Sequence, residues 1–343
     1  MTRRPRSRGS KTGAARGPGP RLSRLGASFI ALLLLCAGWT YWGPGPAAAS
    51  GESTIVQLAP GEGVGGVALN LSRAGVVSSR VAFIAAAVAS GRAHSLKAGE
   101  YEVPTHMSLA GLLDKIHRGL VVRHFVTIPE GFTVRDAVGV LRRADFLTGD
   151  VSAPKEGSLL PETYEVRRGD RREAVLARMV SARSKLLQAL WAARASGLPY
   201  RSAEDAVILA SVVEKETAKT DERPRIAAVF INRLRKGMRL ESDPTVIYGV
   251  SGGVPLGRGL RVSELASTSP YNTYRVAGLP PTPIANPGRA ALAAALQPAR
   301  TDDLFFVADG TGGHVFAATF EAHKRNVAHW RSVEQARCSG AGA

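Results

Sequence analysis

The chain has 343 residues, of which 45% are apolar, enough for about two domains with proper cores. It carries 45 Lys and Arg against 28 Asp and Glu, a formal net charge of +17. Residues 1–51 hold eight of the basic residues and no acidic one, so about half of the excess lies in one Gly/Pro/Ser-rich segment. The remaining charge is spread over the body, with no basic helix that carries interleaved aromatics. This distribution argues against nucleic-acid binding.

The cysteines and histidines do not form the patterns that a metal site or a disulfide framework requires. The two cysteines, Cys36 and Cys338, lie in an apolar segment and in the C-terminal tail, where they cannot easily meet. The seven histidines form no H-E-x-x-H or comparable cluster. We therefore expect neither a metal nor a cofactor.

An uncharged apolar stretch, residues 25–42, follows the basic N-terminal segment. It ends in three aromatic residues, and together with the basic flank it is typical of a single membrane span with a cytoplasmic N-terminus. Three alanines at 47–49 leave open a cleavable signal peptide. We favour an uncleaved anchor, because the apolar core is long for a signal peptide. Residues 1–24 would then form a basic cytoplasmic tail, with the body of the protein outside the cytoplasm.

Residues 54 to about 150 are expected to form a separate small module with internal similarity. The segments 54–77 and 124–147 each predict a strand, a glycine turn and an amphipathic helix. Between them, a strand through Tyr101 and Val103 precedes a helix that Ser108 caps. Small β-α units of this type resemble LysM-like glycan-binding modules. A spacer without binding function is an equal alternative.

Residues 206–237 predict one helix, a short break and a second helix. Ser202 is a suitable N-cap for the first helix. Pro224 suits the first turn of the second helix, which is expected to stop at Gly237. After it, the sequence predicts a helix at residues 289–296 and a hairpin from segments 304–309 and 314–318. The whole is an α+β protein with its second domain at residues 151–332 and a tail at 333–343.

Glu216 extends the most apolar stripe of the first helix. Leu209, Val212 and Val213 stand at i, i+3 and i+4, and Glu216 follows at i+7. An apolar environment disfavours the ionised carboxylate and raises its pKa, which suits a general acid near neutral pH. Glu214 lies about 200° round the helix and cannot share this face. Because a helical Glu is usually solvated or ion-paired, periodicity alone does not make Glu216 catalytic.

Two predicted loops after the helix pair are rich in side chains that suit sugar binding. Tyrosine rings can stack on sugar faces, while Asn, Thr and Asp can bond hydroxyl groups. Ordinary turn chemistry is the alternative. The candidates in residues 241–249 and 269–274 are Asp243, Thr245, Tyr248, Tyr271, Asn272 and Tyr274.

The helix pair is followed by the strings MRLESDPTVIYG, SPYNTYRVAGLPPTPIANPG and LFFVADGTGGHVFAATFEAH. These long strings, in this order, closely resemble the YceG-like (MltG) family of endolytic murein transglycosylases. The resemblance covers residues from about 54 to about 330 and is strongest between 209 and 320. It is far more specific than any single short motif.

The resemblance implies a membrane-anchored lyase of the inner membrane with a periplasmic catalytic domain. Such an enzyme cleaves peptidoglycan glycan strands between N-acetylmuramic acid and N-acetylglucosamine, leaves 1,6-anhydro ends and so terminates nascent glycan elongation. It implies Glu216 as the catalytic acid/base, with Glu214 as fallback, and Glu214 and Asn232 beside the loop residues at the substrate. Membrane peptidoglycan synthases are implied partners.

Two other functions stay open at this point. A lysozyme-type hydrolase would use water and a second carboxylate, for which Asp243 and Glu222 are the candidates. A non-catalytic glycan-binding scaffold of the envelope machinery would need no acid at all.

Overall fold

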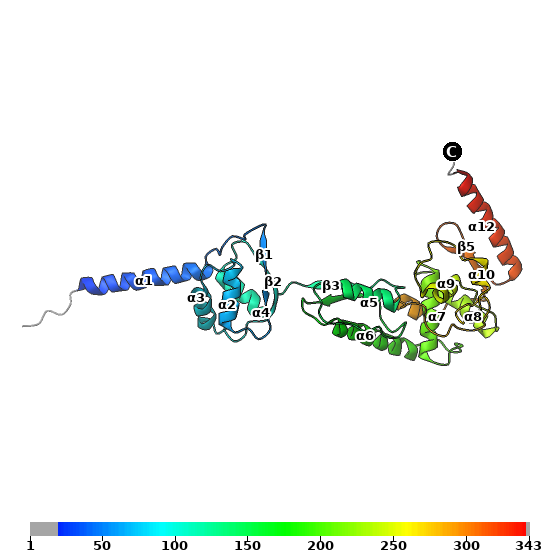
Figure 1. Ribbon diagram of the computed structural model, residues 1–343, viewed down its shortest axis with the longest axis horizontal. Coiled ribbons are helices and arrows are strands. Elements are labelled where there is room, and N and C mark those ends of the chain that lie inside the picture. The colour runs from blue at the N-terminus through cyan, green and yellow to red at the C-terminus, as the bar shows by residue number, and fades with distance from the viewer. Residues whose placement is uncertain (1–19, 341–343) are drawn as a thin grey trace, which may run out of the picture. The chain divides into compact units, whose positions relative to one another are not determined.

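The computed structural model describes residues 20–340, which fall into two compact units divided between Val122 and Arg123 (Figure 1). Most of the predicted basic tail at 1–24 lies outside the described residues. The predicted C-terminal tail is helical as far as Gly340, as part of the last helix, α12 (Phe320–Gly340). The α+β class is confirmed, since the helices accompany three separate two-stranded antiparallel sheets.

The first helix, α1 (Pro20–Trp42), covers the predicted membrane span at residues 25–42. Large apolar side chains along it are exposed. Over residues 20–340, however, no helix is both long enough and apolar enough to cross a membrane. The transmembrane prediction is therefore not confirmed, although the helix is present. The exposed apolar side chains of α1 are Phe29, Ile30, Leu32, Leu33, Leu34, Leu35, Trp39 and Trp42.

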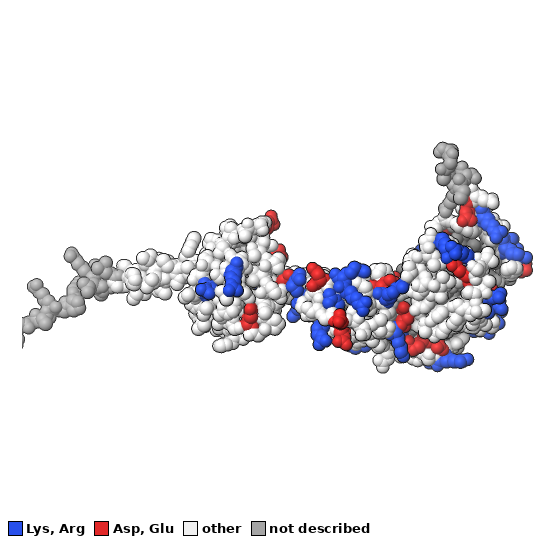
Figure 2. Space-filling model, in the orientation of Figure 1, with Lys and Arg blue, Asp and Glu red and all other residues white. Residues whose placement is uncertain are grey.

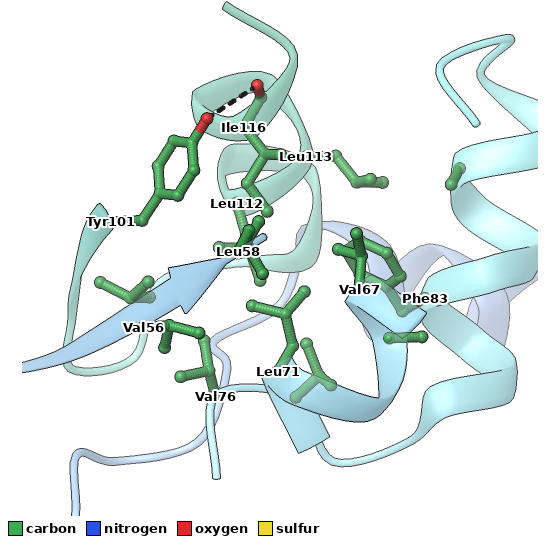
Figure 3. Close-up of a cluster of buried hydrophobic side chains, with 14 residues drawn as sticks. Val56, Leu58, Val67, Leu71, Val76, Phe83, Tyr101, Leu112, Leu113 and Ile116 are labelled. Carbon is green, nitrogen blue, oxygen red and sulfur yellow. Dashed lines mark hydrogen bonds between the residues drawn. The ribbon is translucent and has the colours of Figure 1, made fainter. Parts of the chain in front are cut away.

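The first unit folds three short helices onto one β-ribbon. Its core surrounds Tyr101 and Phe83, both fully buried (Figure 3). The Tyr101 hydroxyl donates to the carbonyl oxygens of Lys97 and Ile116, so the buried polar atom is satisfied. Ser108 caps its helix as predicted, because its hydroxyl accepts from the Gly111 N–H. The elements are β1 (Ser53–Leu58), α2 (Val64–Arg73), α3 (Arg80–Ala89), β2 (Gly99–Pro104) and α4 (Leu109–Arg118).

The two similar segments do form the same local structure. In each, a strand leads through a glycine with positive φ, Gly61 or Gly131, into an amphipathic helix. They find different partners, however. The first strand, β1, pairs with β2, whereas β3 (His124–Thr127) pairs with β4 (Thr163–Val166).

The β3–β4 pairing explains where the structure divides. Residues 123–150 were assigned to the N-terminal module, which was expected to end near residue 150. Because β3 bonds to a strand well beyond that point, these residues belong to the second unit. They bring with them α5 (Val134–Arg143), which shares a core with the long helix α6 (Arg172–Ala192).

The second unit is centred on α7 (Ala203–Glu216), α8 (Arg223–Arg235) and α11 (Arg289–Leu296), which contact one another. Ser202 caps α7 as predicted, in a capping box with Asp205. The hairpin of β5 (Phe305–Ala308) and β6 (His314–Ala317) is also confirmed. One prediction is wrong: residues 241–249 are not a loop. They form most of α9 (Asp243–Ser251), with Pro244 in its first turn, and α10 (Val262–Leu265) follows.

The charged side chains of the second unit are mixed in sign on the face that Figure 2 draws. Basic groups are the more numerous there, but acidic groups lie among them. The first unit shows few charges on the same face. On this face the basic groups are therefore interspersed with acidic ones, as expected from the sequence.

Candidate active site

Glu216 is the last residue of α7. The apolar stripe predicted above it is buried, since Leu209, Val212 and Val213 have no exposed surface. Glu216 itself is partly buried at the C-terminal end of this stripe. The carbonyl end of a helix carries partial negative charge, which further disfavours a carboxylate there.

Three groups from other elements surround the Glu216 carboxyl. The Ser242 hydroxyl donates a hydrogen bond to Oε1. Burial is the main cause that raises the Glu216 pKa to about 7, and the neighbouring Asp243 carboxylate adds to it. The Ser242 hydrogen bond and the Arg233 guanidinium oppose this rise. At neutral pH the carboxyl is therefore close to half protonated, so it can both give and take a proton.

Two threonine hydroxyls hold the backbone of Ser242 in place. Its N–H donates to Thr273 Oγ1 (3.0 Å), and its carbonyl accepts from Thr245 Oγ1 (2.7 Å). The two threonine hydroxyls bond each other at 2.8 Å. The residue before it, Glu241, has φ +55°, a conformation that residues other than glycine rarely adopt. A strained backbone position at a site of this kind is a sign that the surrounding contacts impose the conformation.

Arg233 of α8 supplies much of that constraint. Its guanidinium is nearly buried and donates to the carbonyl of Leu240 (2.9 Å) and to Glu241 Oε2 (3.1 Å). A third bond runs to the carbonyl of Leu304, just before β5 (2.7 Å). Arg233 therefore ties the segment before α9 to the hairpin while its charge lies near Glu216.

Glu214 lies on the opposite face of α7, in a different environment. Its two oxygens accept from Arg223 Nη2 (2.7 Å) and from the backbone N–H of Gly288 (2.9 Å). Arg223 also bonds Glu130 at 3.0 Å. Burial raises the pKa of Glu214, while the Gly288 N–H and the Arg223 charge oppose this rise. Glu214 therefore joins α7, α8 and the start of α11. The contact with substrate stays a prediction.

Four of the predicted sugar-binding residues, Asp243, Tyr248, Tyr271 and Tyr274, are exposed or partly buried. The Tyr274 hydroxyl donates to Asp243 Oδ1 at 2.7 Å, directly beside Ser242. Tyr248 and Tyr271 form a ring pair with centroids 5.1 Å apart. Tyr248 also donates to Glu156 Oε2 (3.3 Å).

Three predicted binding residues have structural partners. Thr245 is fully buried between Ser242 and Thr273. The Asn272 amide, also fully buried, donates to the carbonyls of Leu265 (2.9 Å) and Ser267 (2.8 Å). The Asn232 amide donates to two carbonyls in the segment before β5, residues 301 and 303. These groups shape the loops and offer no free donor toward a sugar.

The YceG-like family model matches residues 56–329, which is most of the chain. The chain belongs to the YceG-like family. Within it, this chain is 29% identical to the endolytic murein transglycosylase of Streptococcus pneumoniae serotype 2 strain D39, over 88% of this chain and 64% of that protein. It therefore spans less than two thirds of the length of this relative.

Two other YceG-like relatives match over more of their own length. The endolytic murein transglycosylase of Bacillus subtilis is 29% identical over 82% of this chain and 86% of that protein. A crystal structure of a putative YceG-like protein from Listeria monocytogenes has a TM-score of 0.51 and 27% identity, over 80% of this chain and 99% of that one. The fold of the family is thus shared over both described units.

In this YceG-like chain, sequence reasoning missed Ser242 and Arg233. Ser242 stood beside Asp243 in a string that was interpreted as a loop, so its hydroxyl received no role. Arg233 follows Asn232 on the predicted helix, where a solvated charge is the ordinary expectation. A signal for Ser242 did exist, since Ser followed by Asp-Pro is typical of a helix N-cap.

Proposed function

We propose that this chain is an endolytic lytic transglycosylase that cleaves peptidoglycan glycan strands between N-acetylmuramic acid and N-acetylglucosamine. The observation that carries the proposal is the partly buried carboxyl of Glu216, with a pKa of about 7 and one oxygen bonded by Ser242. Two YceG-like relatives named endolytic murein transglycosylase support the reaction class.

One titrating carboxyl is sufficient for this reaction. Protonated Glu216 gives its proton to the glycosidic oxygen as the bond to the muramyl anomeric carbon breaks. The Glu216 carboxylate then takes the proton of the muramyl C6 hydroxyl, whose oxygen bonds to the anomeric carbon and closes the 1,6-anhydro ring. The acid is regenerated and no water is consumed. A pKa near neutrality suits both halves of this cycle.

The sugar rings are proposed to contact side chains near Glu216 that are exposed or partly buried. Asp243 is exposed beside Glu216, and Tyr274 holds it by a hydrogen bond. The paired rings of Tyr248 and Tyr271 offer apolar faces for stacking, as sugar rings require. These four side chains remain proposed substrate contacts.

A hydrolase of the lysozyme type is the competing function. It would need a second carboxylate that activates water. Glu222, one candidate, accepts hydrogen bonds from the backbone N–H of His314 (3.1 Å) and from its ring (2.8 Å), so it is engaged with the hairpin. Among residues 20–340, Tyr274 is the hydrogen-bonding side chain of Asp243, which remains the candidate for that alternative.

Mass analysis of the sugar ends separates these functions. The full-length chain is incubated with purified peptidoglycan, beside Glu216→Gln as the inactive control. Anhydro-muramyl ends from the wild type support the proposal. Reducing ends would indicate the hydrolase, and no new ends would favour the scaffold.

Location and attachment are part of the same proposal. Peptidoglycan lies outside the cytoplasmic membrane, so the second unit would work in the periplasm, beside membrane synthases whose strands it terminates. The exposed apolar side chains of α1 support membrane attachment through this helix. If α1 attaches the chain, the full-length protein stays in the membrane fraction after carbonate extraction. A mature N-terminus near Ser50 in cells would refute the uncleaved anchor.

The first unit is proposed to bind glycan as a LysM-like module. It has its own buried core around Phe83 and Tyr101, so the fragment 43–122 can be tested alone. Binding predicts that this fragment pellets with insoluble peptidoglycan at low and moderate salt. A fragment that stays in the supernatant would favour the spacer role.

A further inference from the structure

The Ser242 side chain is oriented in an unusual way for its position. Ser242 is the N-cap residue of α9, where a serine hydroxyl ordinarily accepts from the backbone two or three residues on. Here the side chain makes no capping bond and donates to Glu216 Oε1 instead. The helix thus lacks a side-chain cap at Ser242, and the hydroxyl bonds a group on α7 instead.

The direction of this hydroxyl is fixed by contacts that do not involve it. Ser242 is 1% exposed, and its backbone N–H and carbonyl are bonded to Thr273 and Thr245. Ahead of it, Arg233 holds the Leu240 carbonyl and the Glu241 side chain. Because the backbone is held at both polar atoms, removal of the hydroxyl alone leaves the loop in place.

A hydroxyl that donates to one oxygen of a carboxyl decides where the carboxyl's own proton sits. Oε1 of Glu216 accepts from Ser242, so the proton of the neutral acid belongs on Oε2. We propose that Ser242 is a positioning residue that fixes the Glu216 carboxyl and keeps its transferable proton on Oε2. This proposal rests on the proposed function only for the destination of that proton.

The test uses the full-length chain with Ser242→Ala. Loss of the donor removes a hydrogen bond that favours the carboxylate, so the Glu216 pKa rises above about 7. The alkaline limb of the rate profile for anhydro-muropeptide release then moves to higher pH. We expect kcat to fall about 10- to 100-fold, the loss that goes with one hydrogen bond to a charged group, while KM changes little. Ser242→Thr, which keeps the hydroxyl, should recover the wild-type profile.

A second measurement does not depend on activity. The Glu216 carboxyl carbon is titrated by carbon-13 NMR in glutamate-labelled protein, with the signal assigned by its absence in Glu216→Gln. An upward shift of the titration in Ser242→Ala supports the proposal, and an unchanged titration overturns it. If wild-type protein released no anhydro ends, the proposed function would fail, yet this titration would still decide the role of Ser242.

Ser251→Ala is the matched control. Ser251 ends the same helix, and its hydroxyl bonds the carbonyls of Ile247 (2.9 Å) and Val254 (2.7 Å), away from Glu216. It should leave the Glu216 titration and kcat unchanged. An equal shift in Ser251→Ala would mean that α9 acts through its stability, which overturns a specific role for Ser242.

Discussion

The two faces of the last turn of α7 place two glutamates in opposite situations. Glu214, 3% exposed in its side chain, has both oxygens bonded by Arg223 and Gly288. Glu216 has one oxygen bonded by a neutral hydroxyl and lies near a second carboxylate. Both carboxyls are poorly solvated. The difference between them is the number of partners, which decides whether a proton can be exchanged.

Two residues apart in sequence, Glu214 therefore suits a structural role and Glu216 suits proton transfer. A carboxylate that accepts from a guanidinium and a backbone N–H is stabilised as an anion and held in one orientation. A carboxyl with one neutral donor keeps an oxygen available and a pKa near the working pH. The four predictions below each test one side of this contrast.

Glu216→Gln should have the largest effect. The amide has the same volume but can neither give nor take a proton, so release of anhydro-muropeptides should fall by about 10²- to 10⁴-fold. Folding should survive, because an amide of the same shape replaces a carboxyl that is about half protonated at neutral pH. Glu214→Gln should cost less activity. Digestion assays with a thermal melt of each variant check this, and a larger loss in Glu214→Gln would overturn the assignment.

Arg223→Met should destabilise the second unit strongly, although Arg223 takes no part in the proposed proton transfer. The guanidinium is 5% exposed, and its removal leaves Glu214 buried with only the Gly288 N–H. Breaking a buried pair in this way costs about 3–5 kcal/mol. Urea denaturation measures the loss. The matched control is Arg123→Met, which breaks an exposed pair with Glu165 and should cost about 0–1 kcal/mol. Equal losses would contradict the structural role of this cluster.

The stability of the wild type should decrease as pH rises from about 4.5 to above 7. In that window the folded protein keeps a proton on Glu216 that the unfolded chain has lost, because the pKa is raised to about 7. Protonation of Glu216 contributes roughly 3 kcal/mol at most to the free energy of unfolding, and this contribution is fully present below pH 4.5. Glu216→Gln should lack this component. Urea midpoints at pH 4.5 and pH 8 for both proteins test it, and parallel pH dependence would count against a buried acid.

Asp243→Asn should have the smallest effect. It removes the negative charge that helps to raise the Glu216 pKa, so the alkaline limb of the activity profile should move to lower pH. The change is opposite in sign to that expected for Ser242→Ala. Glu165→Gln, which removes one exposed acid from β4, is the control and should leave the profile unchanged. A large loss of activity in Asp243→Asn would instead favour the hydrolase.

The sequence could predict features that depend on local pattern. The capping box at Ser202, the apolar stripe above Glu216 and the β5–β6 hairpin follow from neighbouring residues, and all are present. The burial of Glu216 was predictable in part for the same reason, since the apolar stripe lies on its own helix, whereas the groups around its carboxyl come from other elements.

Features that depend on distant residues could not be predicted in this way. The pairing of β3 with β4 moved the division between the units, and Arg233 reaches a loop and a hairpin far along the chain. Thr245 and Asn272 have the side chains that sugars favour, but backbone groups already bond them. The kind of side chain therefore predicted that these residues make hydrogen bonds, but it could not predict their partners.

The positive φ of Glu241 limits which sequences this site can evolve toward. Glycine adopts that backbone conformation freely, and asparagine more readily than most residues, so folding alone would select them at this position. A carboxylate side chain, by contrast, pairs its charge with Arg233 as well as accepting its hydrogen bond. In a library that varies position 241, selection for solubility should enrich glycine and asparagine, and selection for activity should return glutamate. The residue found at position 241 would thus distinguish selection for folding from selection for activity.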